Sequence, residues 1–125
     1  MAPKPIFAFA CKLRGSEHES IYNATSAGKA KRQYHLDISD PCPDVKYTDI
    51  RARKIGSAHT SQQFIRNAHY RGLPEVRCGQ RVRVGQEHGT IVGHNSSANF
   101  DVLFDADSRY GEITLNVHPN ELVLS

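Results

Sequence analysis

The sequence predicts an α+β protein whose first part mixes strands with a helix and whose last part is a small β-domain. Two observations lead to this prediction. After Gly79, short apolar runs with a period of two residues recur, and turn residues separate them, as in half-buried strands. Before Gly79, similar runs are interrupted by two stretches in which apolar residues recur every three or four positions, the period of an α-helix.

The first two strands are predicted over residues 5–13 and 19–24. Phe7, Phe9 and Cys11 give the first strand one apolar face. The Arg-Gly-Ser sequence between the two strands favours a turn, so a hairpin is the simplest connection.

A helix is predicted to begin after Thr25 or Ser26, either of which can act as the N-cap, and to end near Ser39. Apolar residues spaced by three and four give it one buried stripe. Two prolines in the following loop prevent its continuation, and residues 45–55 are extended again. This order predicts a ββαβ unit with the helix lying on a three-stranded sheet.

A second helix is predicted over residues 60–71. Thr60 and Gln63 have the spacing of a capping box, and Gly72 is placed to end the helix in the left-handed conformation. A helix of this length is marginal alone and must pack on another element.

The last 47 residues contain five alternating apolar runs. These runs contain Val82 and Val84; Ile91 and Val92; Phe100, Val102 and Phe104; Ile113, Leu115 and Val117; and Leu122 and Leu124. Five short strands in so few residues favour a closed SH3-like barrel over an open sheet, because closure removes the edges. Residues 118–121 are expected to form a short turn or a single 3₁₀ turn before the last strand.

Three segments are therefore expected along the chain. Residues 1–56 form a basic α+β unit, residues 57–78 a connecting helix and loop, and residues 79–125 a five-stranded SH3-like barrel.

Composition indicates a globular protein of the cytoplasm. The chain has 125 residues, 38% of them hydrophobic and 23% charged, which is ordinary for a folded soluble domain. Its longest apolar run, residues 6–11, is too short to span a bilayer. The first residues lack the apolar stretch of a signal peptide. No membrane partner is expected.

The cysteines predict free thiols without a metal. Cys11, Cys42 and Cys78 are far apart, and none belongs to a C-x-x-C pair. Structural zinc sites usually take four ligands in two close pairs, and no histidine lies at such a spacing from a cysteine. We therefore expect neither zinc nor another cofactor.

Catalytic signatures are equally scarce. The sequence contains no G-x-S-x-G elbow, no phosphate-binding P-loop and no G-x-G-x-x-G dinucleotide motif. No catalytic residue is assigned, and the protein is expected not to be an enzyme.

Charge is divided unequally along the chain. Residues 1–78 carry 13 Lys and Arg against 7 Asp and Glu, giving +6, whereas residues 79–125 carry 3 against 6, giving −3. The candidate nucleic-acid-binding residues lie on the first helix and the strand after it: Lys29, Lys31, Arg32, Arg51, Arg53 and Lys54. If they share one surface, they form the basic footprint typical of phosphate binding. The plain alternative is a solvated charged face.

Aromatic residues are interleaved with this basic set. Tyr22, Tyr34 and Tyr47 could stack on bases if they are exposed.

The loop between the second and third strands of the barrel is rich in hydrogen-bonding side chains. Its candidate ligand-binding residues are His94, Asn95, Ser96 and Asn99. Asn and Ser are also ordinary turn residues, because their side chains bond nearby backbone groups. The structural interpretation, a well-formed hairpin loop, is favoured over a polar loop that binds a ligand.

The run GTIVGHNSSANFDVLFD, followed by Asn116, His118 and Pro119, resembles a family of small proteins encoded by tailed bacteriophages and prophages. The stretch from Ala68 to Pro74 is similar to the same family. Members tend to have cysteine at the position of Val117. The family has no assigned activity, so the resemblance implies only a viral protein working in the cytoplasm of a bacterial host.

Three functions follow as hypotheses. The first is a non-enzymatic module that contacts nucleic acid through the basic N-terminal unit. The second is an inhibitor of a host protein or defence complex, in the manner of anti-CRISPR proteins, that acts by protein–protein binding. The third is a head–tail connector component of the virion.

Overall fold

The structure is a computed structural model that describes residues 4–124. Within these residues the chain is α+β, with two α-helices and two antiparallel sheets of three and five strands. It divides into two compact units, the first from Lys4 to His59 and the second from Thr60 onward. Residues 1–3 and 125, at the outer ends of the expected first and last segments, lie outside the described residues.

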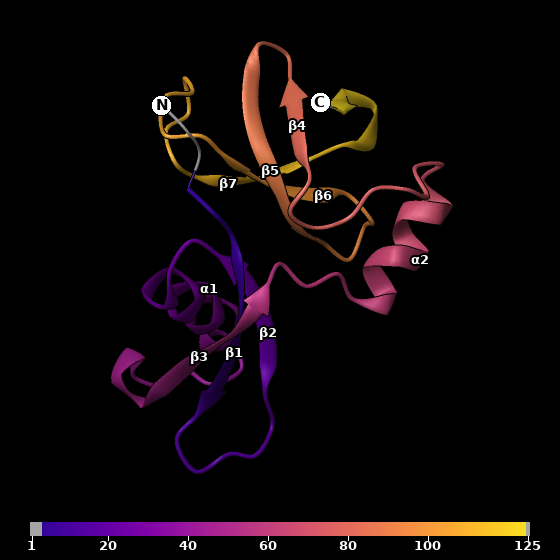
Figure 1. The fold of residues 1–125 in the computed structure, drawn as a ribbon. Helices are drawn as coiled ribbons and strands as arrows, with labels where there is room; N and C mark the ends of the chain where they lie inside the picture. Colours follow the sequence, from indigo (N-terminus) through magenta and orange to yellow (C-terminus); the bar gives the residue numbers. More distant parts are fainter. Residues whose placement is uncertain (1–3, 125) are drawn as a thin grey trace. The chain divides into compact units, whose positions relative to one another are not determined.

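The first unit has the predicted ββαβ order (Figure 1). Its elements are β1 (Phe7–Leu13), β2 (Ser20–Ala24), α1 (Ala27–Ser39), a 3₁₀ turn (Tyr47–Asp49) and β3 (Ile50–Ser57). The sheet order is β2-β1-β3, and both pairings are antiparallel. Ser26 is the N-cap of α1, and its side chain accepts a hydrogen bond from Lys29 N. The first two strands and the helix are thus confirmed within a few residues. The third strand begins only at Ile50, because a 3₁₀ turn occupies Tyr47–Asp49, where an extended chain was predicted.

The core of this unit lies between the sheet and α1. Phe9, Cys11 and Ile50 meet Ala30 and Tyr34 of the helix, and each of the five is at most 5% exposed. Burial of each large side chain contributes about 1.5–3 kcal/mol. The apolar alternation in β1 therefore determines which face of the sheet the helix covers.

The opposite face of the sheet carries small residues at its centre. Ala8 and Ala10 point away from α1, because they alternate with the core residues of β1. The chain after β3 crosses this face near Ala8, where Asn23 Nδ2 donates to His59 O and His59 N donates to Asn23 Oδ1, each at 2.8 Å. Ala8 itself is 1% exposed.

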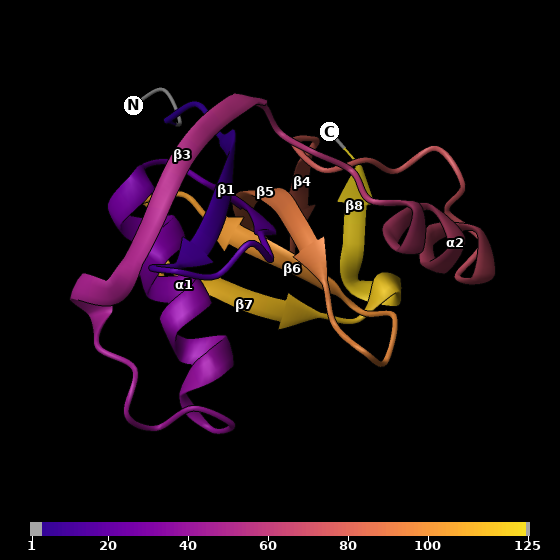
Figure 2. The same ribbon diagram turned by 90° about the horizontal axis from the view of Figure 1, so that it is seen from below.

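The second unit contains one helix and five strands (Figure 2). These are α2 (Gln62–Tyr70), β4 (Arg81–Val84), β5 (Glu87–His94), β6 (Phe100–Phe104), β7 (Thr114–Val117) and β8 (Leu122–Leu124). The sheet order is β7-β6-β5-β4-β8. The predicted 3₁₀ turn before the last strand is confirmed at Pro119–Glu121.

The predicted barrel is not closed, and this part of the prediction is wrong. Among the described residues β7 and β8 are the two edges of an open sheet and do not pair with each other. Helix α2 covers the apolar face instead, with Phe64 and Ala68 packed in one core with Phe100 and Phe104. A sheet covered by a helix does not need to close on itself to bury its apolar face.

The ends of α2 are defined by its neighbouring residues. Ser61, not Thr60, is the N-cap, and its Oγ accepts from Phe64 N at 3.0 Å. Thr60 Oγ1 instead accepts from Cys78 N at 3.0 Å. The predicted capping box of Thr60 and Gln63 is therefore wrong, and the residue three after Ser61 is Phe64, whose side chain cannot return the bond. Gly72 ends the helix with φ +76° as predicted.

Neither helix in the described part of the chain is long and apolar enough to cross a membrane.

Candidate functional site

A groove of about 950 Å³ opens in the first unit, at the end of its sheet where the β1–β2 turn begins. Five basic and two acidic residues line it: Lys12, Arg14, Lys31, Arg51, Arg53, Glu17 and Glu19. Their formal charges sum to +3, so the groove attracts anions.

Strand register explains why these cations meet. Lys12 is directly opposite Arg51 and Ala10 directly opposite Arg53 in the antiparallel pairing of β1 with β3. Residues directly opposite each other project from the same face of a sheet. Because Cys11 and Phe9 point toward α1, Lys12, Arg51 and Arg53 point away from it.

The pairing of Lys12 with Arg51 places like charges opposite each other. Such a cross-strand pair is destabilising, whereas opposite charges at these positions stabilise a sheet. Arg51 is exposed and Lys12 half-buried. An anion bound between them would relieve the repulsion.

Arg53 has an acidic partner. Its Nη2 donates to Oε1 and Oε2 of Glu19 at 3.1 and 3.2 Å. The Arg53 side chain is 66% exposed and that of Glu19 34% exposed. Glu19 precedes β2 and Arg53 lies on β3, so the ion pair bridges the central strand, where Ala10 leaves room for it.

The six predicted basic residues do not share one surface. Lys31, Arg51 and Arg53 line the groove. Lys29 and Arg32 are exposed on α1, outside the stripe that packs on the sheet. Lys54 is opposite the core residue Phe9, hence on the helix-covered face, and its Nζ lies 3.6 Å from the centroid of the Phe7 ring.

Sequence reasoning missed Lys12 and Arg14. The signal was present, because the alternation that buries Phe9 and Cys11 also places Lys12 on the opposite face. Without the register of β1 against β3, however, Lys12 could not be matched to Arg51.

The tyrosines are not placed to stack on bases. Tyr34 is 5% exposed in the core, and Tyr22 packs edge-on against it with ring centroids 5.9 Å apart. Tyr22 also donates to Asp37 Oδ2 at 2.6 Å, and burial and this bond raise the pKa of Tyr22. Tyr47 donates to Gly28 O at 3.0 Å. None of the described residues that line the groove is aromatic.

The predicted polar loop of the second unit is tied together by its own side chains. Asn95 Oδ1 accepts from the backbone N–H groups of Ser97 and Asn99 at 2.9 and 3.0 Å. His94 Nδ1 lies 2.9 Å from Asn67 Nδ2 of α2, and Ser96 is exposed. These bonds are those of a structured turn, and ligand binding by the loop stays a hypothesis.

Arg71 fastens this loop to the end of α2. Its guanidinium donates to Ser97 O at 2.9 Å, to Asn99 Oδ1 at 3.1 Å and to Ala98 O at 3.3 Å. Arg77 likewise donates to Pro74 O and Val76 O, at 2.7 and 2.8 Å. Both arginines therefore hold the second unit together.

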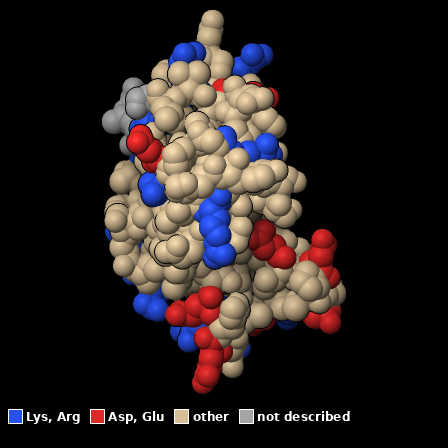
Figure 3. Space-filling model, turned by 90° about the vertical axis from the view of Figure 1, so that its right-hand side faces the viewer, with Lys and Arg blue, Asp and Glu red and all other residues tan. Residues whose placement is uncertain are grey.

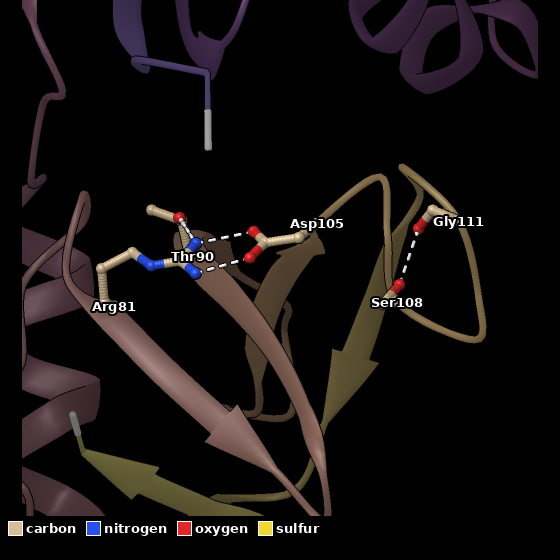
Figure 4. Close-up of polar contacts among 5 residues, drawn as sticks. All are labelled: Arg81, Thr90, Asp105, Ser108 and Gly111. Carbon is tan, nitrogen blue, oxygen red and sulfur yellow. Dashed lines mark hydrogen bonds and ion pairs between the residues drawn. The ribbon is translucent and has the colours of Figure 1, made fainter. Parts of the chain in front are cut away.

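One ion pair in the second unit is well shielded. Arg81 donates to Asp105 through two parallel bonds of 2.7 and 2.6 Å, and its Nη1 also lies 2.9 Å from Thr90 Oγ1 (Figure 4). The Arg81 side chain is 34% exposed and that of Asp105 16% exposed. The bonds from Arg81 lower the pKa of Asp105, although desolvation opposes this shift. The pair joins β4, β5 and the end of β6.

The cysteines are all free thiols. Cys11 is buried, Cys78 is half-buried and Cys42 is exposed. Burial raises the pKa of Cys11 to about 11, with Lys31 opposing the shift. Among residues 4–124, no three His, Cys, Asp or Glu side chains gather as they would around a metal ion.

Basic and acidic side chains are interspersed on the face of the protein seen in Figure 3, which carries no continuous basic patch. No known family model, curated protein or solved structure matches the chain.

Proposed function

We propose that the protein is a non-enzymatic binding module that contacts the phosphate backbone of nucleic acid through the basic groove of its first unit. The observation that carries the proposal is the like-charged pair Lys12 and Arg51 on one exposed sheet face. Arg14 and Arg53 line the same groove, and Lys31 of α1 lines it from the helix side of the sheet. Cations gathered in this way bind phosphates by releasing the counterions around a nucleic acid.

The chemistry of the groove favours backbone contact over base recognition. Guanidinium and ammonium groups bind phosphate oxygens, whereas single-stranded nucleic acid is usually held by stacking on aromatic side chains. Because Tyr22 and Tyr34 are used in the core, we expect duplexes to bind with little dependence on sequence.

The test is fluorescence anisotropy of a labelled DNA or RNA duplex over a series of salt concentrations. Arg51→Ala should reduce the slope of log K against log salt by about one unit, since each phosphate contact contributes about 0.9. Arg32→Ala is the matched control, because Arg32 is exposed on the same unit but does not line the groove. If Arg51→Ala and Arg32→Ala reduce the salt slope equally, the groove is not the binding site. Absence of binding at low salt would refute the proposal.

Inhibition of a host protein is the second candidate, and the edge strand β7 favours it. Among the described residues β7 pairs only with β6, so its other side can accept a strand from a partner. Leu115, on this edge strand, is 36% exposed, and Ile113, just before it, is 47% exposed. A stoichiometric host protein that survives nuclease and high salt, and that Leu115→Lys releases, would support this function over the first.

The proposal also covers where the protein acts and which fold its second unit has. The resemblance to phage and prophage proteins supports a viral protein that acts in the bacterial host cytoplasm. Five antiparallel strands with a 3₁₀ turn before the last one support an SH3-like sheet that remains open because α2 covers its core.

A further inference from the structure

We infer that Glu19 is a built-in competitor that occupies Arg53 until a polyanion displaces it. This inference depends on the proposed function, because it concerns the same groove. Glu19 would then set how strongly the groove binds phosphate and how many phosphates it engages.

The geometry of the pair carries the inference. Both carboxylate oxygens of Glu19 accept from the single Nη2 of Arg53, at 3.1 and 3.2 Å. The Glu19 carboxylate thus binds only the Nη2 end of the guanidinium. The Nε and Nη1 atoms of Arg53 donate no hydrogen bond to Glu19. A phosphate oxygen could approach these nitrogens first and replace the carboxylate afterwards.

The exposure of the pair makes this exchange easy. Because the Arg53 side chain is 66% exposed, the ion pair is screened by water and contributes little to stability. Displacing Glu19 therefore costs little in folding. A duplex brings several phosphates in a row, so a phosphate next to the one held at Lys12 and Arg51 competes with Glu19 at a high local concentration.

The masking has a measurable consequence for salt dependence. In the free protein Glu19 already neutralises Arg53. When a phosphate of the duplex binds Arg53, it replaces the Glu19 carboxylate, so one anion is exchanged for another. Lys12 and Arg51 lie opposite each other, and neither has an ion-pair partner among the described residues. Arg51 should therefore contribute its full share to the salt slope, and Arg53 only a fraction of it.

The test is a double-mutant cycle in the full chain, measured as the salt dependence of duplex binding. Glu19→Gln should tighten binding at low salt about two- to fivefold, the range expected for one exposed charge pair. It should also steepen the slope by up to about one unit. Arg53→Ala should change the slope by less than half a unit in the native background, and by about one unit in the Glu19→Gln background.

Two controls separate masking from a general charge effect. Glu17→Gln removes the same charge from the same groove, and no bond from Glu17 to Arg53 is found among the described residues. It should leave the effect of Arg53→Ala unchanged. Arg51→Ala should change the slope equally with and without Glu19→Gln.

The outcomes are distinguishable. If the native protein binds duplexes and Arg53→Ala has the same effect in both backgrounds, Glu19 does not mask Arg53, and only this inference is overturned. If neither the native protein nor Glu19→Gln binds at low salt, the proposed function fails and the inference fails with it.

Discussion

Replacing Asp105 by asparagine should destabilise the second unit while hardly changing its shape. Asparagine keeps the size of the side chain but removes the charge and turns an amide nitrogen toward one donor of Arg81. Two charge-assisted bonds of 2.6 and 2.7 Å are affected. Bonds to charged groups contribute about 1.5–3 kcal/mol, and the Arg81 side chain is 34% exposed to water. We therefore expect Asp105→Asn to lower the free energy of unfolding by about 2 kcal/mol.

The pH dependence gives a second measure of the same contact. The folded-state pKa of Asp105 is lowered, chiefly by the bonds from Arg81. Its contribution to the free energy of unfolding is therefore fully present above its unfolded pKa, about 4, and is lost as pH falls through the lower folded value. The difference between the native protein and Asp105→Asn should be constant near neutral pH and shrink below about pH 4.

Urea unfolding followed by circular dichroism is the appropriate assay, because urea does not screen charges as guanidinium chloride does. Hydrogen exchange at β4 and β5 assigns the loss to the second unit. Asp107→Asn is the matched control, since it removes a nearby exposed charge. If both variants lose the same stability at neutral pH, or if the difference persists at pH 2, the Arg81–Asp105 pair does not stabilise the unit as argued.

Three further outcomes test the fold. Gly89→Ala should lower the free energy of unfolding in urea by about 2 kcal/mol, because the added Cβ would lie 2.6 Å from Val102 Cγ1 and 2.8 Å from Leu103 O. Gly93→Ala is the control and should cost clearly less, because its Cβ would lie 3.4 Å from its nearest neighbour, Asp101 Oδ2. Ser61→Ala should cost about 1 kcal/mol, as for loss of an N-cap bond, and an unchanged midpoint would contradict this capping. A thiol reagent should count three thiols in the denatured chain; in the native protein the exposed Cys42 should react first and the buried Cys11 last, and the reverse order would contradict the burial.

The periodicity of the sequence was sufficient to predict the elements. Alternation and three-to-four spacing depend on neighbouring residues, so the strands, both helices and the 3₁₀ turn at Pro119–Glu121 could be found locally. The 3₁₀ turn at Tyr47–Asp49 was missed, because these residues were predicted as part of the third strand. Closure of the barrel could not, because it depends on where α2 packs. With Phe64 and Ala68 in the core, the sheet remains open, and Leu115 and Leu124 on its edge strands are left 36% and 45% exposed.

The site was predicted only in part, for a related reason. The phase of a helix or strand can be read from sequence, but the faces that two elements present to each other cannot. Arg51 and Arg53 were correctly expected on one side of their strand, and β1 supplies Lys12 opposite them. Lys29 was expected beside them, but α1 lies on the other face of the sheet, and of the three basic residues predicted on it only Lys31 lines the groove.

Formal charge is therefore a poor guide to the charge that an external anion meets. In the second unit Arg71, Arg77 and Arg81 are each bonded to acceptors of their own unit, and neutralising one of them would weaken the fold before it weakened any binding. Substitutions at Lys12 and Arg51 should act in the opposite way. Relief of their repulsion should leave the urea midpoint unchanged or slightly higher, while duplex binding falls. A variant such as Asp105→Asn should shift the midpoint and leave the salt slope of binding unchanged. Measuring both quantities on the same set of variants separates the charges that hold the protein together from those available to a ligand.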